Sequence, residues 1–456
     1  MDRTTEILSG YACALRYEDL PHETIHQVKR TLIDTVGCAI GGFNAQPSEI
    51  ARKLALSVTS ALPSRIIGTS QTSAPDLAGF ANGVMARYLD CNDSYFSPGG
   101  GHPSDMIPAV LAVADPLRAD GRTVVTAIVL SYEIFCRLSD QVVVSDYGWD
   151  QGIFSVLGAA CGAGKVMGLS REAMSQAISL AIVPNLPMFV TRVGELSMWK
   201  GCATASATKA GIFAALLAQA GMSGPEAPFE GRGGLWAHAG GKPVILERFG
   251  NRGEPFRIMN TLFKSFPSQV HTQGPISLAL ELRPQVAPSE IAAIRLRTYQ
   301  AAMRSAADPE KWAPQTRETA DHSIPYLVAT AFQTGAVTPA SFTTERLQDP
   351  AVRELIAKMT VDEDPAFTKR FPKDYPCLLE VTTKADRHLL AETSHPPGHR
   401  LNPLSDNQVM EKFSRFAGSL LTKERCQAVI DLLWALEKLS NLKPLFDQLL
   451  VPSPAP

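Results

Sequence analysis

Apolar residues recur at helical spacing through most of the first 262 residues. Between residues 23 and 42 (ETIHQVKRTLIDTVGCAIGG) the residues that share one apolar face are Ile25, Val28, Leu32, Val36 and Ile40. The segment ends in two glycines, which often stop a helix. Residues 203–221 (ATASATKAGIFAALLAQAG) are apolar or small on nearly every side, which is typical of a helix buried among other helices. The pattern predicts a large helical domain with closely packed core helices.

Strand-like alternation of apolar and polar residues appears later in the chain. Residues 291–300 (IAAIRLRTYQ) and 377–386 (CLLEVTTKAD) alternate in this way, as half-buried strands do. A helical stretch, residues 322–335, and loops rich in proline and aspartate lie between them. This part of the chain predicts a small α+β domain.

The chain returns to a helical pattern after the segment HPPGHRLNPLSD and keeps it to the end. We therefore predict a mainly α fold with two domains. A large all-helical domain is built from both chain ends, residues 1–263 and 403–456, and a smaller α+β lid domain is inserted at residues 264–402.

Composition and charge restrict the class of function. The 456 residues are 45% hydrophobic and 19% charged, as in ordinary globular proteins, and the formal net charge is −2. Neither this charge nor any basic run predicts binding to nucleic acid or to an acidic membrane surface. We expect the protein to act on a small molecule or on another protein.

The N-terminal sequence and the apolar runs predict a cytoplasmic protein. The first residues, MDRTTEILSGYACALRYEDL, contain early acidic side chains and no apolar stretch of signal-peptide length. The longest apolar-leaning run, residues 210–222, is shorter than the roughly 20 residues that cross a bilayer, and we expect it to form a buried helix.

Eight cysteines are scattered along the chain without a Cys-x-x-Cys pair. This spacing argues against a zinc site and gives no local signature of an iron–sulfur cluster. We expect buried free thiols in a reducing compartment. A metal-dependent lyase of the aconitase type is a disfavoured alternative for the same reason.

The segment YLDCNDSYFSPGGGHPSD concentrates polar groups beside glycine. Asp90, Asn92, Asp93 and His102 lie in or near the glycine run, where the backbone can approach a ligand closely. Acid–base chemistry, a metal site, and a loop held by capping and Asx turns all fit these residue types. A single histidine is a small ligand set for a metal, so acid–base chemistry is our preferred interpretation.

Two lysines stand out from their surroundings. Lys200 lies in the largely apolar RVGELSMWKGCATA, where a buried ammonium needs either an acidic partner such as Glu195 or a bound anion. Lys264 and His271 lie in FKSFPSQVHTQ at the predicted domain junction, where ligands often bind. A surface lysine and an unrelated histidine on a linker are the alternative.

The segment ETADHSIPYLVA carries Asp321, His322 and Ser323 immediately before a predicted helix. Alone, it fits a helix N-terminus with Ser323 as the capping oxygen and Asp321 near the positive helix end. Together, the four segments offer aspartate and histidine for proton transfer and lysine for carboxylate binding. Such a mix suits elimination next to a carboxylate: a base removes the α-proton, an acid protonates the leaving hydroxyl, and cations stabilise the growing negative charge.

These segments resemble the MmgE/PrpD family, whose members include 2-methylcitrate dehydratase, cis-aconitate decarboxylase and iminodisuccinate epimerase. The resemblance is carried by GHPSD, GELSMWKG, FKSFPSQVHTQ and ETADHSIPY, and it extends from LIDTVGCAIGG through FEGRGGLW to HPPGHRLNPLSD. It implies a homodimer in which the active site lies between a large helical domain and a smaller lid. It also implies that neither a metal nor an organic cofactor is needed.

The resemblance assigns candidate residues by motif. The residues that match the family's active-site motifs are Asp93, His102, Lys200, Lys264, His271 and Tyr326. We expect His102 and His271 to share proton transfer, with Asp93 orienting a histidine or acting as base.

The remaining candidates are expected to bind the substrate. Lys200 and Lys264 would bind its carboxylates and stabilise the intermediate, and Tyr326 would hydrogen-bond near the leaving hydroxyl. Asn92 and Gln273 complete the expected substrate contacts.

Local details separate the members of the family. The interval in KSFPSQVH, with Gln273 following, resembles the dehydratase branch, as does GHPSD. At Asp150–Gln151 the family carries a histidine at or next to this position, so a proton donor is missing here. Met106 stands where a polar Asn is expected, which predicts a more apolar pocket edge.

Together with the resemblance, the sequence therefore predicts a cofactor-independent hydro-lyase that dehydrates 2-methylcitrate, or a related tricarboxylate, to 2-methyl-cis-aconitate by acid–base elimination. Decarboxylation of cis-aconitate and epimerisation of a dicarboxylate are the alternatives on the same scaffold. A protein that binds such acids without turnover is a third interpretation, because a histidine of the pocket is missing.

Overall fold

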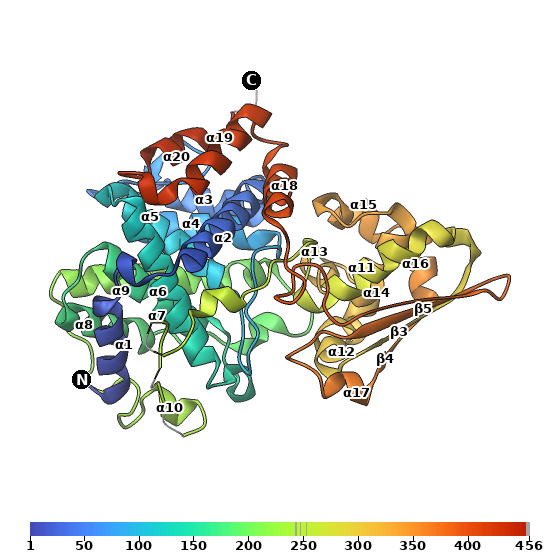
Figure 1. Ribbon diagram of the computed structural model, residues 1–456, viewed down its shortest axis with the longest axis horizontal. Coiled ribbons are helices and arrows are strands. Elements are labelled where there is room, and N and C mark those ends of the chain that lie inside the picture. Colours follow the sequence, from blue (N-terminus) through green and yellow to red (C-terminus); the bar gives the residue numbers. More distant parts are fainter. Residues whose placement is uncertain (242–243, 247, 252, 453–456) are drawn as a thin grey trace.

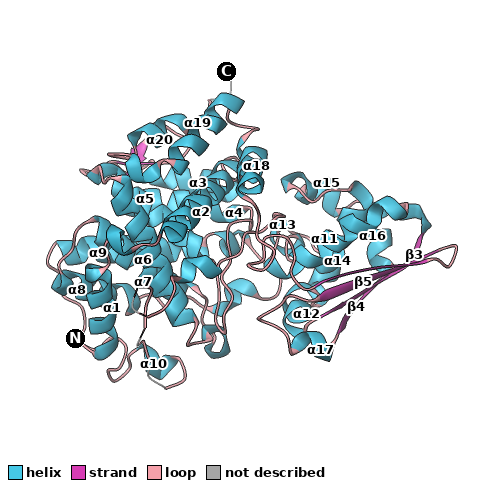
Figure 2. Cartoon of the chain, viewed as in Figure 1, coloured by secondary structure: helices cyan, strands magenta, loops and turns pink. Residues whose placement is uncertain are grey.

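The computed structural model describes residues 1–241, 244–246, 248–251 and 253–452, which form two unequal lobes (Figure 1). The larger lobe is helical and contains both the first and the last helices of the chain. The smaller lobe contains a sheet flanked by helices (Figure 2). The mainly α fold predicted from the sequence is confirmed.

Helices of the larger lobe surround one core. Their bounds are α1 Arg3–Ala14, α2 His22–Gly41, α3 Gln46–Ala55, α4 Pro75–Tyr88, α5 Ile107–Leu117, α6 Gly121–Ser139, α7 Gly152–Val166, α8 Arg171–Ile182, α9 Ala203–Gln219, α10 Leu235–His238, α18 Asp406–Ala417, α19 Lys423–Trp434 and α20 Lys443–Gln448. Two short strands, β1 Ser64–Arg65 and β2 Thr72–Ser73, pair beside them. The helix predicted over residues 23–42 is α2, and Val28, Leu32 and Ile40 on its apolar face have no exposed surface.

Glycine lets the central helices of this lobe pack closely. A Cβ atom on Gly158 of α7 would lie 2.2 Å from the sulfur of Met106, and one on Gly211 of α9 would lie 2.7 Å from the Cβ of Ala159. Met106 is fully buried in this contact. The predicted apolar pocket edge at Met106 is therefore wrong, because its side chain belongs to the core.

The smaller lobe is built on a four-stranded sheet. Its strands are β3 Ile291–Thr298, β4 Met359–Glu363, β5 Cys377–Thr383 and β6 His388–Thr393, in the order β4-β3-β5-β6. Only the β3–β4 pair of this sheet is parallel. The helices of the lobe are α11 Gln273–Leu282, α12 Gln300–Ala306, α13 Arg317–Ala320, α14 Ile324–Thr334, α15 Thr344–Leu347, α16 Pro350–Ala357 and α17 Pro365–Thr368. The strands predicted at 291–300 and 377–386 are β3 and β5, and the first ends earlier than predicted because α12 begins at residue 300.

Each lobe has its own hydrophobic core. The first core contains residues from Leu8 to Phe263 and again from Leu404 to Leu449. The second core contains residues from Leu262 to Ala391. The chain thus enters the second core at residues 262–263, and the predicted domain limits at 263 and 403 stay predictions.

Two further expectations concern the whole chain. In the described part of the chain, no helix combines the length and the apolar character needed to cross a bilayer. All eight cysteines are free thiols, and every one except the half-buried Cys13 is buried, as the sequence predicted.

A buried ion pair joins the two ends of the chain. Helix α18 packs on α2 (Figure 1), and Lys412 Nζ lies 2.5 Å from Asp34 Oδ1. The same ammonium donates to the backbone oxygen of Cys91 at 2.6 Å. Burial outweighs the attraction of Lys412 and raises the pKa of the Asp34 carboxyl. The C-terminal helices therefore support the loop at Cys91, which lies 321 residues before Lys412.

We predict that Lys412→Met destabilises the fold strongly, because it leaves the Asp34 carboxylate buried without its cation. Breaking a buried ion pair in this way costs about 3–5 kcal/mol. Urea denaturation followed by circular dichroism measures the change. The double variant Lys412→Met/Asp34→Asn should recover much of the loss, because neither charge remains. Equal destabilisation in the single and double variants would show that the charge is not the cause.

Candidate active site

The polar loop that follows α4 is fixed by backbone pairing. Asp90 has a left-handed backbone, with φ of 49°, a conformation that Asp adopts more readily than most residues. Further along, Ser94 pairs with Leu262, and Tyr95 pairs with Gly101. The loop therefore lies against the segment that leads into the smaller lobe.

Asp90 is the centre of a buried ion network. Its carboxylate accepts hydrogen bonds from Arg87 and, at 2.5 Å, from Lys264, and it lies 3.1 Å from Lys200 Nζ. All four side chains are at most 2% exposed. Burial opposes ionisation, but the three cations outweigh it and hold the pKa of the Asp90 carboxyl well below its usual range. Asp90 is therefore a fixed negative charge.

A second carboxylate extends the network into the smaller lobe. Lys200 Nζ donates to both oxygens of Asp321 at 3.0 Å, and Arg317 donates to it at 3.1 Å. His322 Nδ1 lies 2.5 Å from Asp321 Oδ1, and its Nε2 lies 3.7 Å from Asp90 Oδ2. Lys200 thus bridges the two lobes through two protein carboxylates.

His102 presents one unengaged ring nitrogen to this region. Its Nδ1 lies 2.7 Å from the backbone oxygen of Asp93, which can only accept, so the proton of the neutral ring is on Nδ1. Within the described chain, Nε2 makes no hydrogen bond. Burial, together with Arg87 and Lys264, lowers the pKa of His102 well below its ordinary value. At neutral pH the ring is uncharged, and Nε2 can accept a proton.

His271 is held by aromatic residues of the smaller lobe and of the loop. Its Nδ1 lies 2.6 Å from the hydroxyl of Tyr299, and its ring packs against Phe96 and Phe371. Burial lowers the pKa of His271 to about 3. Burial and the neighbouring ammonium likewise lower the pKa of His322 to about 4. Both rings are therefore neutral at physiological pH.

His102, His271 and His322 line a cavity of about 670 Å³ between the lobes, a volume typical of small-molecule sites. The polar and aromatic residues that line it are Arg87, Asp90, Phe96, His102, Ser145, Asp146, Gln151, Phe189 and Arg192 from the larger lobe and its loops, and Gln269, His271, Gln300, Arg304, Ser305, Asp308, Lys311 and His322 from the smaller lobe. Four cations and three carboxylates line this cavity, and the excess of one positive charge favours an anionic ligand.

Asp93 and Asn92 lie behind this wall. The Asp93 carboxylate accepts from the backbone N–H of Ser104 at 3.0 Å and from the hydroxyl of Tyr132 at 2.8 Å, and burial raises its pKa to about 7. Asn92 donates to the hydroxyl of Ser104 and to a neighbouring carboxylate. Neither residue is among the described residues that line the cavity. Asp93 orients His102 through its backbone oxygen, not through its carboxylate.

Gln273 and Tyr326 also lie outside the cavity. Gln273 accepts from the backbone N–H groups of Ser265 and the next residue, and so holds the turn after Lys264. The Tyr326 hydroxyl donates to the backbone oxygen of Ser341, and the ring lines a separate pocket. The expected contact of Tyr326 with a leaving hydroxyl is not what the structure shows, because this tyrosine faces the interior of the smaller lobe.

Gln151 occupies the position at which the family pattern led us to expect a histidine. Its Oε1 accepts from the backbone N–H of His102 at 2.8 Å, and Asp150 pairs with Arg192 at 2.6 Å. Gly101 provides the space, because a Cβ atom there would lie 1.8 Å from that amide oxygen. Gln151 therefore holds the His102 loop and carries no titratable proton.

One group of ligands in the described chain, Asp90, Asp321 and His322, is close enough to share a metal ion. The two carboxylates already contact the ammonium groups of Lys200 and Lys264. A divalent cation would meet these ammonium groups at short range, so the donor set fits the protein's own cations better than a metal. Lys200 and Lys264 point to these carboxylates and are not among the described residues that line the cavity. The sequence had predicted direct substrate contacts for both lysines.

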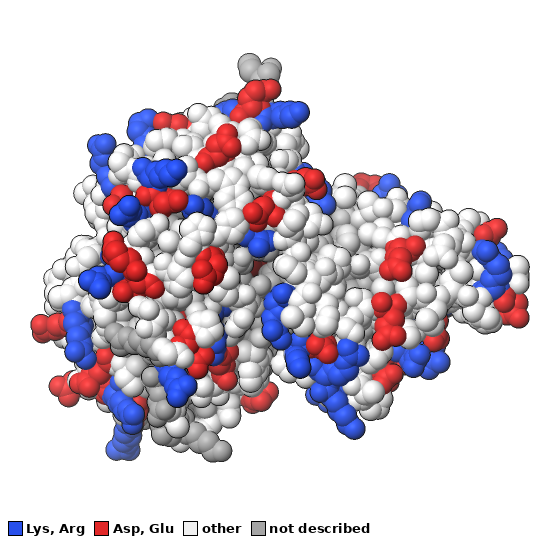
Figure 3. All heavy atoms as spheres, in the orientation of Figure 1, with Lys and Arg blue, Asp and Glu red and all other residues white. Residues whose placement is uncertain are grey.

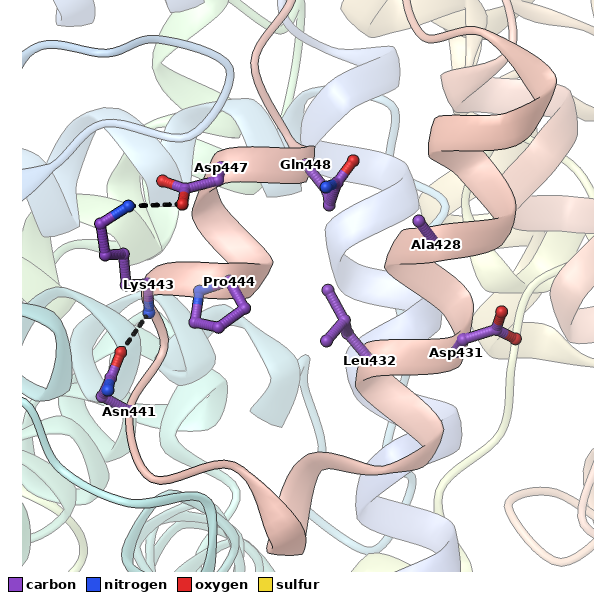
Figure 4. A pocket seen from close by; sticks show the side chains of 8 residues that line it. All are labelled: Ala428, Asp431, Leu432, Asn441, Lys443, Pro444, Asp447 and Gln448. Carbon is purple, nitrogen blue, oxygen red and sulfur yellow. Dashed lines mark hydrogen bonds and ion pairs between the residues drawn. The ribbon is translucent and has the colours of Figure 1, made fainter.

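A second hollow, of about 660 Å³, lies between α19 and α20 (Figure 4). Leu432 and Pro444 face each other across it, and Lys443 is paired with Asp447 at 2.6 Å. None of the described residues that line it is a histidine. The chemistry predicted from the sequence therefore lies in the cavity between the lobes.

Several residues of the cavity were not singled out by sequence. They are Arg87, Arg192, Arg304 and Lys311. Alone, the segment of Asp321 and His322 predicted a helix N-terminus, and that prediction is confirmed for Ser323, whose hydroxyl accepts from the N–H of Tyr326 at 3.0 Å. The same segment was also grouped with the clusters that offer Asp and His for proton transfer, but neither Asp321 nor His322 was given a role of its own.

Most of the chain is similar to a known protein family. The MmgE/PrpD N-terminal domain matches residues 6–245, and the MmgE/PrpD C-terminal domain matches residues 266–436. The 2-methylcitrate dehydratase of Cupriavidus necator is 28% identical over 424 residues, which cover 84% of each chain. That of Escherichia coli K12 is 29% identical over 401 residues, covering 80% of this chain and 78% of the relative. Human cis-aconitate decarboxylase is 24% identical over 471 residues, covering 99% of this chain and 95% of the relative.

We predict that His102 and His322 are both neutral at pH 7 and carry their proton on Nδ1, because a carbonyl oxygen and a carboxylate oxygen accept from that atom. Long-range ¹H–¹⁵N spectra of histidine-labelled protein distinguish this form, with His102→Gln and His322→Gln assigning the signals. An imidazolium pattern at pH 7 would contradict the prediction.

The same spectra, recorded at several pH values, give the pKa of His322, which sets the sign of its effect on the stability of the fold. In the folded chain His322 takes up its proton near pH 4 instead of 6.5. Between these values the unfolded chain binds more protons, so His322 makes the fold less stable as the pH falls from about 6.5 to about 4.

Proposed function

The chain belongs to the MmgE/PrpD family and is an enzyme of the lyase class, and from this premise we propose that it removes water from 2-methylcitrate or a closely related tricarboxylate. The observation that carries the proposal is the neutral ring of His102, which lines the cavity between the lobes and whose Nε2 makes no hydrogen bond within the described chain. The walls suit a substrate with several carboxylates, and the imidazole suits removal of a proton next to one of them.

Surplus positive charge supports carboxylate binding. The buried network contains four cations, Arg87, Lys200, Lys264 and Arg317, and three carboxylates, Asp90, Asp105 and Asp321. Attraction between charges is stronger in such a buried site than in water. Arg87 is the cation of this network that lines the cavity, and in our proposal it binds the carboxylate next to the reacting carbon. Lys200 and Lys264 do not contact the substrate in this proposal; they keep Asp90 and Asp321 ionised and in place.

His102 is the base of the proposed reaction. Its Nε2 takes the proton from the carbon next to the carboxylate, and the ring becomes an imidazolium. The hydrogen bond from Nδ1 to the backbone oxygen of Asp93 holds the ring in one orientation and stabilises the charge that forms. Asp93 and Gln151 are positioning residues, because each contacts His102 and lies against its loop.

His271 delivers a proton to the leaving hydroxyl in this proposal. Its pKa of about 3 describes a site without substrate, where burial disfavours the cation. A bound polyanion places negative charge beside the ring and raises this pKa, so the ring carries a proton when substrate is present. Tyr299 holds Nδ1 and leaves Nε2 for the substrate. The hydroxyl leaves as water. His102 then releases its proton to solvent, and His271 takes up a proton from solvent, which restores both rings.

Residues 264–402 act as a lid in the same proposal. His271, Arg304, Lys311 and His322 line the cavity and come from this segment. Enclosure between the lobes would exclude water and strengthen each charge interaction. The reaction proceeds through the protein's own acids and bases, and we propose no cofactor for it.

Decarboxylation of cis-aconitate is the second candidate, because the similarity to human cis-aconitate decarboxylase covers 99% of this chain. That reaction must add a proton to carbon after carbon dioxide leaves. Gln151 contributes an amide where the family pattern led us to expect a histidine, and an amide does not supply that proton. Dehydration is therefore our preferred reaction.

We predict that EDTA-treated protein converts 2-methylcitrate to a product with a conjugated double bond, and that His102→Asn lowers kcat by about 10²–10⁴-fold, the usual contribution of a general base. Asn keeps a donor near the position of Nδ1 but has no atom in the place of Nε2. Ultraviolet absorbance measures turnover, and thermal unfolding should show a nearly unchanged fold. His388→Asn, at a histidine whose side chain is 73% exposed, is the matched control and should keep full activity.

Three outcomes would contradict this proposal. Retention of more than a tenth of the activity by His102→Asn would remove His102 as the base. Absence of an absorbance change with 2-methylcitrate and citrate, together with carbon dioxide release from cis-aconitate, would favour the decarboxylase. Solvent deuterium exchange at a stereocentre without elimination would instead indicate an epimerase.

A further inference from the structure

One cation in the cavity wall has no partner among the residues that the structure describes. The acids that neutralise the other arginines and the lysine of the wall are Asp90 for Arg87, Asp150 for Arg192 and Asp308 for Lys311. Arg304 of α12 also lines the cavity, but its guanidinium makes no hydrogen bond or ion pair with any described residue. Its charge is therefore available to a ligand.

The position of Arg304 is fixed by the helix that carries it. The residues of α12 that line the cavity are Gln300, Ala301, Arg304 and Ser305, which share one helical face. Helix α12 begins directly after Tyr299, whose hydroxyl contacts His271. At a rise of about 1.5 Å per residue, Arg304 lies roughly 7.5 Å along the helix axis from Tyr299. It is thus held at a defined distance from the proposed proton donor.

The surroundings of α12 carry further positive charge. Lys and Arg side chains gather over α12 and α17 on one face of the smaller lobe (Figure 3). Lys369 and Lys373, which follow α17, are exposed and make no ion pair with described residues. Such a surface attracts polyanions toward the cavity.

One acid at the cavity offers an alternative partner for Arg304. Asp146 lies in the larger lobe, is exposed, and makes no ion pair within the described chain. A contact between Arg304 and Asp146 would hold the lobes together and would not select a substrate. The two roles differ in what happens when Asp146 is neutralised.

We propose that Arg304 is a specificity residue that binds a substrate carboxylate remote from the reacting carbon, and so selects a tricarboxylate over a dicarboxylate. This inference rests on the proposed function, since it takes the cavity as the substrate site. The reacting end of the substrate lies against His102 and Arg87, and the third carboxylate extends to α12. A guanidinium suits this task because its two parallel N–H groups match the two oxygens of a carboxylate.

The test is titration calorimetry of the full chain with two probes, tricarballylate (propane-1,2,3-tricarboxylate) and succinate. We expect Arg304→Gln to weaken tricarballylate binding by about tenfold or more, as loss of a hydrogen bond between charged groups does, and to change succinate binding by less than about twofold. Arg304→Lys should weaken tricarballylate binding less than Arg304→Gln does, because it keeps the positive charge. Lys369→Gln is the matched control, because it removes an unpaired exposed cation of the same lobe that does not line the cavity.

Several results would overturn the inference. They are equal weakening for both probes, no weakening for either, no tricarballylate binding by the unaltered chain, and Asp146→Asn reproducing the effect of Arg304→Gln. Turnover of 2-methylcitrate with an unchanged KM in Arg304→Gln would also overturn it while leaving the hydro-lyase proposal intact. Conversely, Arg304-dependent tricarballylate binding without any turnover would reject the hydro-lyase proposal and keep the inference.

Discussion

A buried carboxylate, Asp90, is the constraint on which much of the structure depends. An ionised carboxylate in the interior needs compensating charge, because isolated burial costs several kcal/mol or more. Its cations come from separate parts of the chain: Arg87 from α4, Lys200 from the segment before α9, and Lys264 from the entrance to the smaller lobe. The Asp90 carboxylate is compensated in full only when all three converge on it. The position of Asp90 therefore fixes the loop after α4, the start of the second core and the contact between the lobes.

The same burial determines the chemistry of the histidines. Removal from water disfavours imidazolium, and the nearby cations add to this effect, so His102, His271 and His322 have lowered pKa values. Neutral rings can accept protons at physiological pH, whereas charged rings cannot. Backbone and hydroxyl contacts then decide which nitrogen of His102 and His271 is left for a ligand. The ion network thus provides both a positive field for an anionic substrate and uncharged bases beside it.

Sequence patterns predicted the elements whose burial follows a regular period. Helix α2 has a clear apolar face, and β3 and β5 alternate, but β6 is an edge strand with little buried surface and was not predicted. For the site, the polar segments indicated which parts of the chain carry chemistry, yet not which atoms face the cavity. Tyr326 and Tyr299 illustrate the limit, because only three-dimensional packing turns the first toward Ser341 and the second toward His271.

Charge pairing also indicates how a ligand can reach the cavity. Lys200 of the larger lobe donates to both oxygens of Asp321 of the smaller lobe, and this contact is buried. Separation of the lobes along this contact would leave unpaired buried charges, at a cost of about 3–5 kcal/mol for each broken pair. The exposed charged residues Asp146 and Arg304 of the cavity wall have no ion pair with described residues to lose. If residues 264–402 act as the lid that we propose, its motion would pivot on the ion network and open at α12.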